Sequence, residues 1–226
     1  MNLNTFDHVA LWAAQRDELA LVLVECCGMH EIEQTDRFTL VGGDARRGKL
    51  TLFDAEGPRE AGVLERVILR LPAPEEAQER LEASGIVTDA NGMITAELPS
   101  GLPVGLVPAA EGTVTDLDHV VLRVPDPSAT ASGLEQLGLE REGRELHVAD
   151  KQVVLREAAA EEGERPLLNH LAFLVDAASD IVLEARSRGI EIDNVVDAPN
   201  TRAVFLWGPD RIKLEYVEHK PGFSLV

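Results

Sequence analysis

The sequence predicts an α+β protein made of four tandem βαβββ modules, because the same series of features recurs four times along its 226 residues. Each segment opens with an alternating or fully apolar run, which is typical of a strand, and continues with a helical pattern. A glycine then stands where the helix should end, and two or three short strand-like runs follow it.

The elements follow in a fixed order within each module. The apolar runs predict first strands at 6–13, 64–72, 117–125 and 168–176. Helices are expected to follow over 15–27, 74–84, 128–137 and 177–188. The residues expected to end these helices in the left-handed conformation are Gly28, Gly85, Gly138 and Gly189. Later strands are expected near 37–43, 48–54, 93–97, 102–107, 144–149, 151–157, 200–206 and 211–217.

Proline and capping residues support these boundaries. The pairs Pro72 with Pro74 and Pro125 with Pro127 stand where a strand should end and a helix begin, since proline breaks a ladder but suits a first helical turn. Ser128 and Asp176 are the expected N-caps of the last two helices. The link PAAEGTVT at 108–115 is small and polar, which predicts two domains, 1–111 and 115–226, each made of two consecutive modules.

Composition excludes several functions. The net charge of −19 and the absence of a basic patch argue against binding to nucleic acid or to an anionic membrane surface. No apolar run is long enough to cross a bilayer, and the first residues do not have the order of a secretory signal, so we expect a soluble cytoplasmic protein. Cys26 and Cys27 are adjacent in a predicted helix and are expected to be reduced and partly buried.

Three residues in the C-terminal half suggest a metal site. His119 in LDHVVL, His170 in LNHLAF and Glu215 in IKLEYVE occupy equivalent positions of repeating units. Two imidazoles and one carboxylate hold a divalent cation and leave coordination positions free. The equivalent positions of the N-terminal half are His8, Arg66 and about Leu106, of which only the first could bind a metal, so that half is expected to be a metal-free scaffold with His8 as a remnant.

The chain resembles the vicinal oxygen chelate superfamily, which includes glyoxalase I, bleomycin-resistance proteins and type I extradiol dioxygenases. The resemblance lies in the tandem modules, in the DHV and NHL motifs on first strands, and in the last strand GPDRIKLEYVE. Four modules with the ligands in the C-terminal pair resemble a two-domain extradiol dioxygenase with two cup-shaped pseudo-barrels. This implies a small catechol-like aromatic substrate, O2 and a non-heme Fe(II), with Mn(II), Zn(II) or Ni(II) as other candidates. By analogy we expect a homo-oligomer.

The acid/base residues of extradiol enzymes are not matched. Their positions read about Val153, about Val196 and Phe205 in this sequence. His147 and His219 are the remaining candidates for catalytic acid/base residues.

Two alternatives remain open. A glyoxalase-like isomerase would need a fourth, carboxylate ligand, which Glu157 could provide if the strand alignment slips by two positions; otherwise Leu155 stands there. A bleomycin-resistance-like protein would bind a small molecule without chemistry, although aromatic residues make up only 4% of the chain.

Overall fold

The computed structural model describes residues 1–143, 145–158 and 165–226, and it contains the four expected modules. Each module opens with a long strand: β1 (Thr5–Ala13), β5 (Leu64–Leu71), β9 (Asp116–Val124) and β13 (Leu168–Leu174). Each of these strands leads into a helix: α1 (Arg16–Glu25), α2 (Pro74–Ala83), α3 (Pro127–Gln136) and α4 (Ala178–Ser187). The predicted α+β class and the four βαβββ units are therefore confirmed.

Three further strands complete each module. They are β2 (His30–Gln34), β3 (Phe38–Gly42), β4 (Lys49–Asp54), β6 (Thr88–Asp89), β7 (Ile94–Leu98), β8 (Leu102–Pro108), β10 (Glu140–Glu142), β11 (Glu145–Val148), β12 (Lys151–Glu157), β14 (Ile192–Asp197), β15 (Thr201–Trp207) and β16 (Lys213–His219). Short 3-10 turns, η1 (Pro99–Gly101) and η2 (Pro209–Arg211), precede β8 and β16. Four of these strands, β2, β6, β10 and β14, had no predicted range of their own, because these mostly exposed edge strands lack an alternating pattern.

The ends of the helices follow the predicted chemistry only in part. All four expected glycines have a positive φ after their helices, as the sequence predicted. The N-caps differ from the prediction. Asp126, rather than Ser128, caps α3, because its side chain accepts hydrogen bonds from two backbone N–H groups at 3.0 Å. At α4 the Glu218 carboxylate accepts from the backbone of Ala178, while Asp176 accepts from Asn4 instead.

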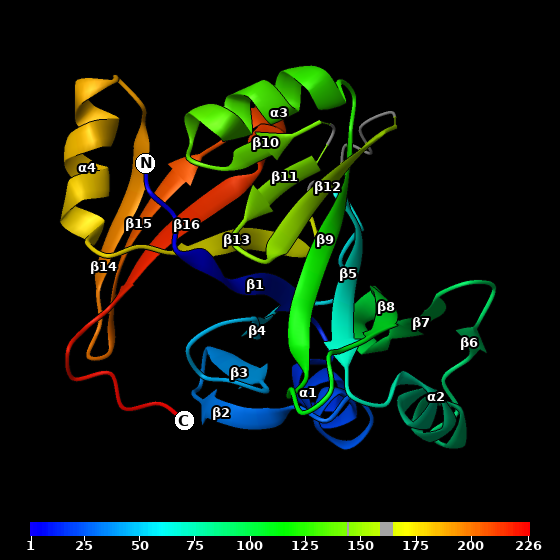
Figure 1. The fold of residues 1–226 in the computed structure, drawn as a ribbon. Coiled ribbons are helices and arrows are strands. Elements are labelled where there is room, and N and C mark those ends of the chain that lie inside the picture. Colours follow the sequence, from blue (N-terminus) through cyan, green and yellow to red (C-terminus); the bar gives the residue numbers. More distant parts are fainter. Residues whose placement is uncertain (144, 159–164) are drawn as a thin grey trace.

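The modules combine into two eight-stranded mixed sheets (Figure 1). Sheet 1 has the order β14-β15-β16-β13-β1-β4-β3-β2, and sheet 2 has the order β10-β11-β12-β9-β5-β8-β7-β6. The first and fourth modules therefore share sheet 1, and the second and third share sheet 2. This corrects the expected pairing of consecutive modules, because each sheet crosses the boundary between the predicted halves 1–111 and 115–226.

The connection between the two middle modules packs against the first module. The Thr115 hydroxyl donates a hydrogen bond to the carbonyl of Cys27 at 2.7 Å. A Cβ atom at Gly43 would lie 2.1 Å from the Thr115 carbonyl oxygen, so this approach requires glycine. Both cysteines are free and buried, as predicted. The link at 109–115 is thus held against the protein rather than separating two independent halves.

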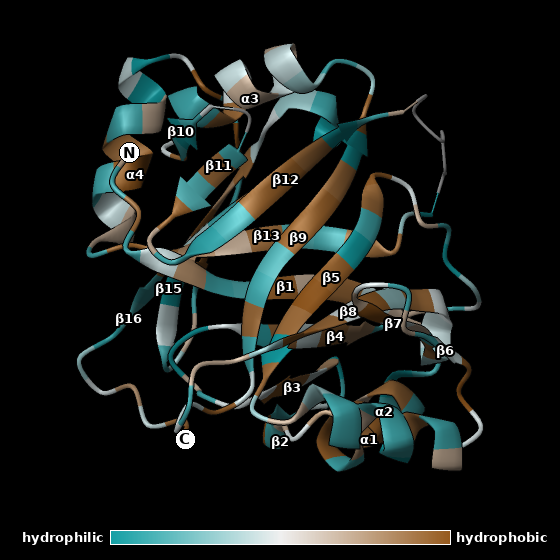
Figure 2. Cartoon of the chain, turned by 45° about the vertical axis from the view of Figure 1, so that its right-hand side comes forward, coloured by the Kyte–Doolittle hydropathy of each residue, from teal (hydrophilic) through white to brown (hydrophobic). Residues whose placement is uncertain are grey.

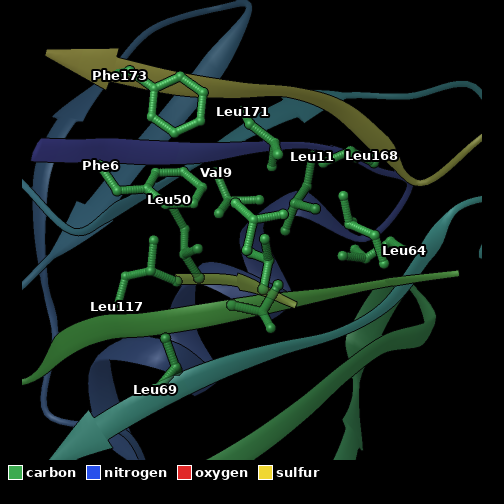
Figure 3. Packing of buried hydrophobic residues seen from close by; sticks show 14 of the residues in the cluster. Phe6, Val9, Leu11, Leu50, Leu64, Leu69, Leu117, Leu168, Leu171 and Phe173 are labelled. Carbon is green, nitrogen blue, oxygen red and sulfur yellow. The ribbon is translucent and has the colours of Figure 1, made fainter. Parts of the chain in front are cut away.

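One hydrophobic core joins the facing sides of the sheets with the buried sides of the helices. Figure 3 shows Phe6, Val9 and Phe173 of sheet 1 packing toward Leu69 and Leu117 of sheet 2. Hydrophobic residues concentrate along the central strands, while α2 is mainly hydrophilic (Figure 2). We call the side of each sheet that faces this core its inner face, and the opposite side its outer face.

Candidate metal centre

A β-bulge directs each first-strand histidine to the outer face of sheet 1. In the antiparallel pair β1–β13, Phe6 is paired with Phe173 and His8 with Ala172, so Asp7 is the extra residue in β1. In β13 the extra residue is Asn169, because Ala10 pairs with His170 and Leu11 with Leu168. An extra residue reverses the alternation of side chains. Phe6 therefore enters the core although it lies only two residues before His8.

Three donor atoms meet on this outer face. The Nε2 atoms of His8 and His170 lie 3.1 and 2.8 Å from one oxygen of Glu215, and 3.2 Å from each other. The side chains are only 12%, 4% and 10% exposed, respectively. β1, β13 and β16 are adjacent strands, and the pairing of Ala172 with Glu215 places the carboxylate beside the two rings. Among the described residues, this is the one group of three or more metal-binding side chains that converge in this way.

The bulge residues orient the two imidazole rings. The Asp7 carboxylate lies 2.8 Å from Nδ1 of His8, and the Asn169 side-chain oxygen lies 3.0 Å from Nδ1 of His170. These oxygens are hydrogen-bond acceptors, so they place the proton of each neutral ring on Nδ1 and leave the Nε2 lone pair toward Glu215. Metal-binding histidines have the same second contact. Two lone pairs and a carboxylate oxygen then face one another, an arrangement that a metal ion or a proton between them would stabilise.

The pKa values show the same attraction for positive charge. Burial disfavours a charged ring at His8, yet the hydrogen bonds to Asp7 and Glu215 raise its pKa to about 9. Burial likewise acts to raise the pKa of Glu215, but His170 and His8 lower it to about 2. Burial lowers the pKa of His170. The carboxylate therefore stays ionised, and one unit of positive charge, from a proton or a metal ion, is favoured beside it.

The spacing of the donors fits a divalent metal ion. Two atoms that each lie about 2.1 Å from a cation, at about 90° to each other, are about 3.0 Å apart. The three observed separations, 2.8, 3.1 and 3.2 Å, lie close to that value. His8, His170 and Glu215 could thus occupy one face of a coordination shell and leave the other face open.

Thr51 stands where a fourth protein ligand would be. In sheet 1 the parallel pair β1–β4 matches the parallel pair β13–β16. In the first pair Ala10 lies opposite Thr51, and in the second Ala172 lies opposite Glu215. Paired residues project on the same side of a sheet. The position equivalent to the Glu215 carboxylate therefore carries a buried threonine, which lacks the negative charge and the basicity of a carboxylate.

Apolar and aromatic side chains surround the three donors. The ring of Phe205 lies 5.2 Å from that of His170, edge to face, and Phe53 lies 6.2 Å from it. Trp12 and Phe38 extend this group through Phe53, with ring centroids 5.6 and 5.8 Å away. These four aromatic residues are half-buried. Two aromatic rings, Phe53 and Phe205, thus lie next to the donor His170.

A buried charge network supports His8 from behind. Lys49 donates to Asp7 at 3.0 Å and to the Ala45 carbonyl at 2.7 Å, and both charged side chains are buried. Nε2 of His219 lies 3.0 Å from the same carboxylate, and its ring stacks on Phe223 at 4.1 Å. Burial would raise the pKa of Asp7, but Lys49, His219 and His8 lower it. Asp7 is therefore held as an anion that fixes the His8 ring.

The structure brings together two of the three expected ligands. His170 and Glu215 lie in the cluster, but His119 lies on β9 in sheet 2, with Nδ1 2.6 Å from Asp118. His8, expected to be a remnant, takes its place. The reason is the pairing of the modules: in sheet 1 the partner of the fourth module is the first, not the third. The local sequence could not distinguish the two, since His8 and His119 both follow aspartate in a DHV motif.

The other predicted positions lie at varying distances from the cluster. His219 contacts Asp7 behind the cluster, whereas His147 lies on β11 in sheet 2, near Glu145 at 3.6 Å. Phe205 lines the site, but Val153 is buried in sheet 2 and Val196 lies on the edge strand β14. Leu155 and Glu157 belong to β12 in sheet 2, so neither is near the three donors. Asp7 and Asn169 were not predicted; a polar residue directly before each histidine was the available signal.

Comparisons with solved structures reveal a shared fold at low sequence identity. A Bacillus subtilis structure described as a "putative dioxygenase" matches with a TM-score of 0.78 and 18% identity, covering 98% of this chain and 87% of that one. Glyoxalase I from Zea mays matches with a TM-score of 0.72 and 17% identity over 95% of this chain and 92% of that one. The cppA protein from Streptococcus pneumoniae matches with a TM-score of 0.62 and 15% identity over 96% and 100%.

Sequence comparison adds nothing to this assignment, since no protein-family model and no curated protein matches the chain. No helix among the described residues is long and apolar enough to cross a membrane. The four βαβββ modules, the two eight-stranded sheets and the matches over nearly the whole chain lead to one conclusion. This chain has the fold of the vicinal oxygen chelate superfamily, with a buried His-His-Glu cluster that could bind a divalent metal ion.

Proposed function

We propose that this protein is a metal-dependent dioxygenase that acts with O2 on a small catechol-like aromatic compound. In this proposal His8, His170 and Glu215 hold Fe(II). The observation that carries it is the three-donor set with Thr51, rather than a carboxylate, at the fourth equivalent position. Two histidines and one carboxylate that leave several positions open are typical of non-heme Fe(II) oxygenases.

The residues around the donors suit an aromatic anion. Phe53 and Phe205 lie on two sides of His170 and offer apolar surface to a ring. Two neutral imidazoles and one carboxylate would give a site with a divalent ion a net charge of +1, which attracts a catecholate. Bound Fe(II) would supply Lewis-acid activation and electron transfer to O2. Asp7 and Asn169 would keep both Nε2 atoms unprotonated for binding.

Neither His147 nor His219, the two expected acid/base residues, contacts the coordination positions that the three donors leave open. His219 is a positioning residue in this proposal, because it contacts Asp7, which in turn contacts His8. His147 lies in the other sheet and has no part in the reaction.

A glyoxalase-like isomerase is the second candidate. Its support is the likeness of fold to glyoxalase I from Zea mays, with a TM-score of 0.72. Thr51 counts against it, because an isomerase of this kind needs a carboxylate that serves as ligand and base. Glu157, the residue expected to supply it, lies on β12 in sheet 2.

The test begins with anaerobic purification and metal analysis, followed by oxygen uptake with a panel of catechols. We expect one Fe(II) or Mn(II) per chain and oxygen consumption with at least one catechol. Activity on a methylglyoxal hemithioacetal with Ni(II) or Zn(II), without oxygen uptake, would replace the proposal by the isomerase. Tight binding of aromatic compounds without bound metal or turnover would replace it by small-molecule sequestration.

A further inference from the structure

The outer face of sheet 2 is the counterpart of the metal centre, with different chemistry. β5 and β9 pair in the same way as β1 and β13, with Glu65 and Asp118 as the extra residues. The positions equivalent to the two ligand histidines are Arg66 and His119. The positions equivalent to Thr51 and Glu215 are Gly105, paired with Ile68, and Val154, paired with Val121. Without a carboxylate and with an arginine, this set cannot hold a metal cation.

Arg66 is a half-buried cation without a protein partner. Within the described residues it has no hydrogen bond and no ion pair, and its Nε atom is shielded from solvent without a partner. A polar N–H group shielded from water and left unpaired is unfavourable, so folded proteins normally pair it. Arg66 therefore has free hydrogen-bond donors on the outer face of sheet 2. The equivalent face of sheet 1 carries His8 and His170.

The neighbouring charges do not neutralise this face. Glu65 is the nearby carboxylate, and it is already engaged by Arg156 at 2.7 Å and by Arg123 at 3.6 Å. His119, diagonal to Arg66 across the strand pair, has its Nδ1 bound to Asp118, so its Nε2 remains for another partner. Among the described residues, Arg66 therefore stands on this face without a counter-ion of its own.

The residues between Arg66 and His119 are apolar. Ile68, Val121 and Val154 are paired across three neighbouring strands with Arg66 and His119, and they project from the same face. Ile68 and Val121 are buried, whereas Val154 is partly exposed, so Val154 is the one of the three with surface left for a ligand. A ligand with one oxyanion and a small apolar body would place the oxyanion on Arg66 and the body against Val154, and the planar fork of arginine matches a carboxylate with two parallel hydrogen bonds.

We propose that the outer face of sheet 2 is a second ligand site, which binds a small apolar carboxylate through Arg66, with His119 as its neighbour. This site is independent of the metal centre, because it shares no residue with it. The protein would thus hold a metal-dependent site on one sheet and a carboxylate site on the equivalent surface of the other.

Isothermal titration calorimetry of the full chain with benzoate, and with inorganic phosphate for comparison, tests the proposal. We expect one benzoate site, at least tenfold weaker binding in Arg66→Gln, and weaker binding of phosphate than of benzoate. Glu215→Gln, in the metal centre, and Arg188→Gln, at the C-cap of α4, should leave benzoate binding within twofold. Arg66→Lys keeps the positive charge but not the planar guanidinium, so it should weaken benzoate binding by an intermediate factor. This variant also tests the proposal if Arg66→Gln does not fold.

Thermal unfolding provides a second readout. Removing an unpaired cation should leave the melting temperature of Arg66→Gln equal to or above that of the unmodified chain, and benzoate should raise the melting temperature of the unmodified chain alone. The proposal is overturned if folded protein gives no benzoate heat, or if Arg66→Gln binds benzoate as well as before. Loss of binding in Glu215→Gln, or phosphate binding as tight as benzoate, would overturn it as well.

Discussion

Replacing His8 by alanine should remove metal binding, whereas the same change at His119 should leave it intact. The two histidines have the same local sequence, the same bulge and the same contact with a preceding aspartate. They differ in what faces them: His8 lies 3.1 Å from the Glu215 carboxylate, and His119 has no carboxylate at the equivalent position. His119→Ala is therefore a closely matched control for the expected loss in His8→Ala.

The size of the effect follows from the number of donors. Structural zinc sites with four ligands contribute about 10–16 kcal/mol of binding free energy, or about 2.5–4 kcal/mol per ligand. Loss of one donor should thus weaken metal binding by about 100- to 1000-fold. Competition with a chelator of known affinity measures this, and EDTA should lower the melting temperature of the unmodified chain and of His119→Ala but not of His8→Ala. Equal losses in both variants would refute the assignment of His8, as would undiminished metal binding in a folded His8→Ala.

Three further changes test separate parts of the structure. Asp7→Asn should weaken metal binding by about 10- to 100-fold, because it no longer orients the His8 ring. It should also destabilise the fold by about 3–5 kcal/mol, because Lys49 loses its buried partner. Chelator competition measures the first effect and urea unfolding the second, and Asp118→Asn, which should not change metal affinity, is the control. Thr51→Glu should place a fourth ligand, a second carboxylate, on the same face of sheet 1, so we expect loss of catechol-dependent oxygen uptake with metal still bound; unchanged oxygen uptake would contradict the role given to this position. Phe6→Ala should cost about 3–5 kcal/mol in unfolding free energy, because this ring is fully buried and lies 4.9 Å from Phe173; a cost below about 1 kcal/mol in chemical denaturation would show that the inner face of β1 is not part of the core.

The amino-acid sequence determined the local structure of this protein. The alternating runs, the prolines and the four glycines act within a few residues, and they were enough to predict four βαβββ modules and the equivalent positions His8, Arg66, His119 and His170. Glu215 was predicted in the same way, from its position on the last strand of the fourth module. The bulges at Asp7 and Asn169 were missed, because an extra residue in a strand is visible only against its partner strand.

Only the tertiary structure decided which modules share a sheet, and with that which histidine joins Glu215. The connections at 55–63, 109–115 and 158–167 can each extend about 20 Å or more, which allows several arrangements of the modules. The arrangement found pairs β1 with β13 and buries the inner faces of both sheets in one core. His8 and His119 are equivalent in sequence, and the neighbouring strand alone makes one a metal-ligand candidate and the other a neighbour of Arg66.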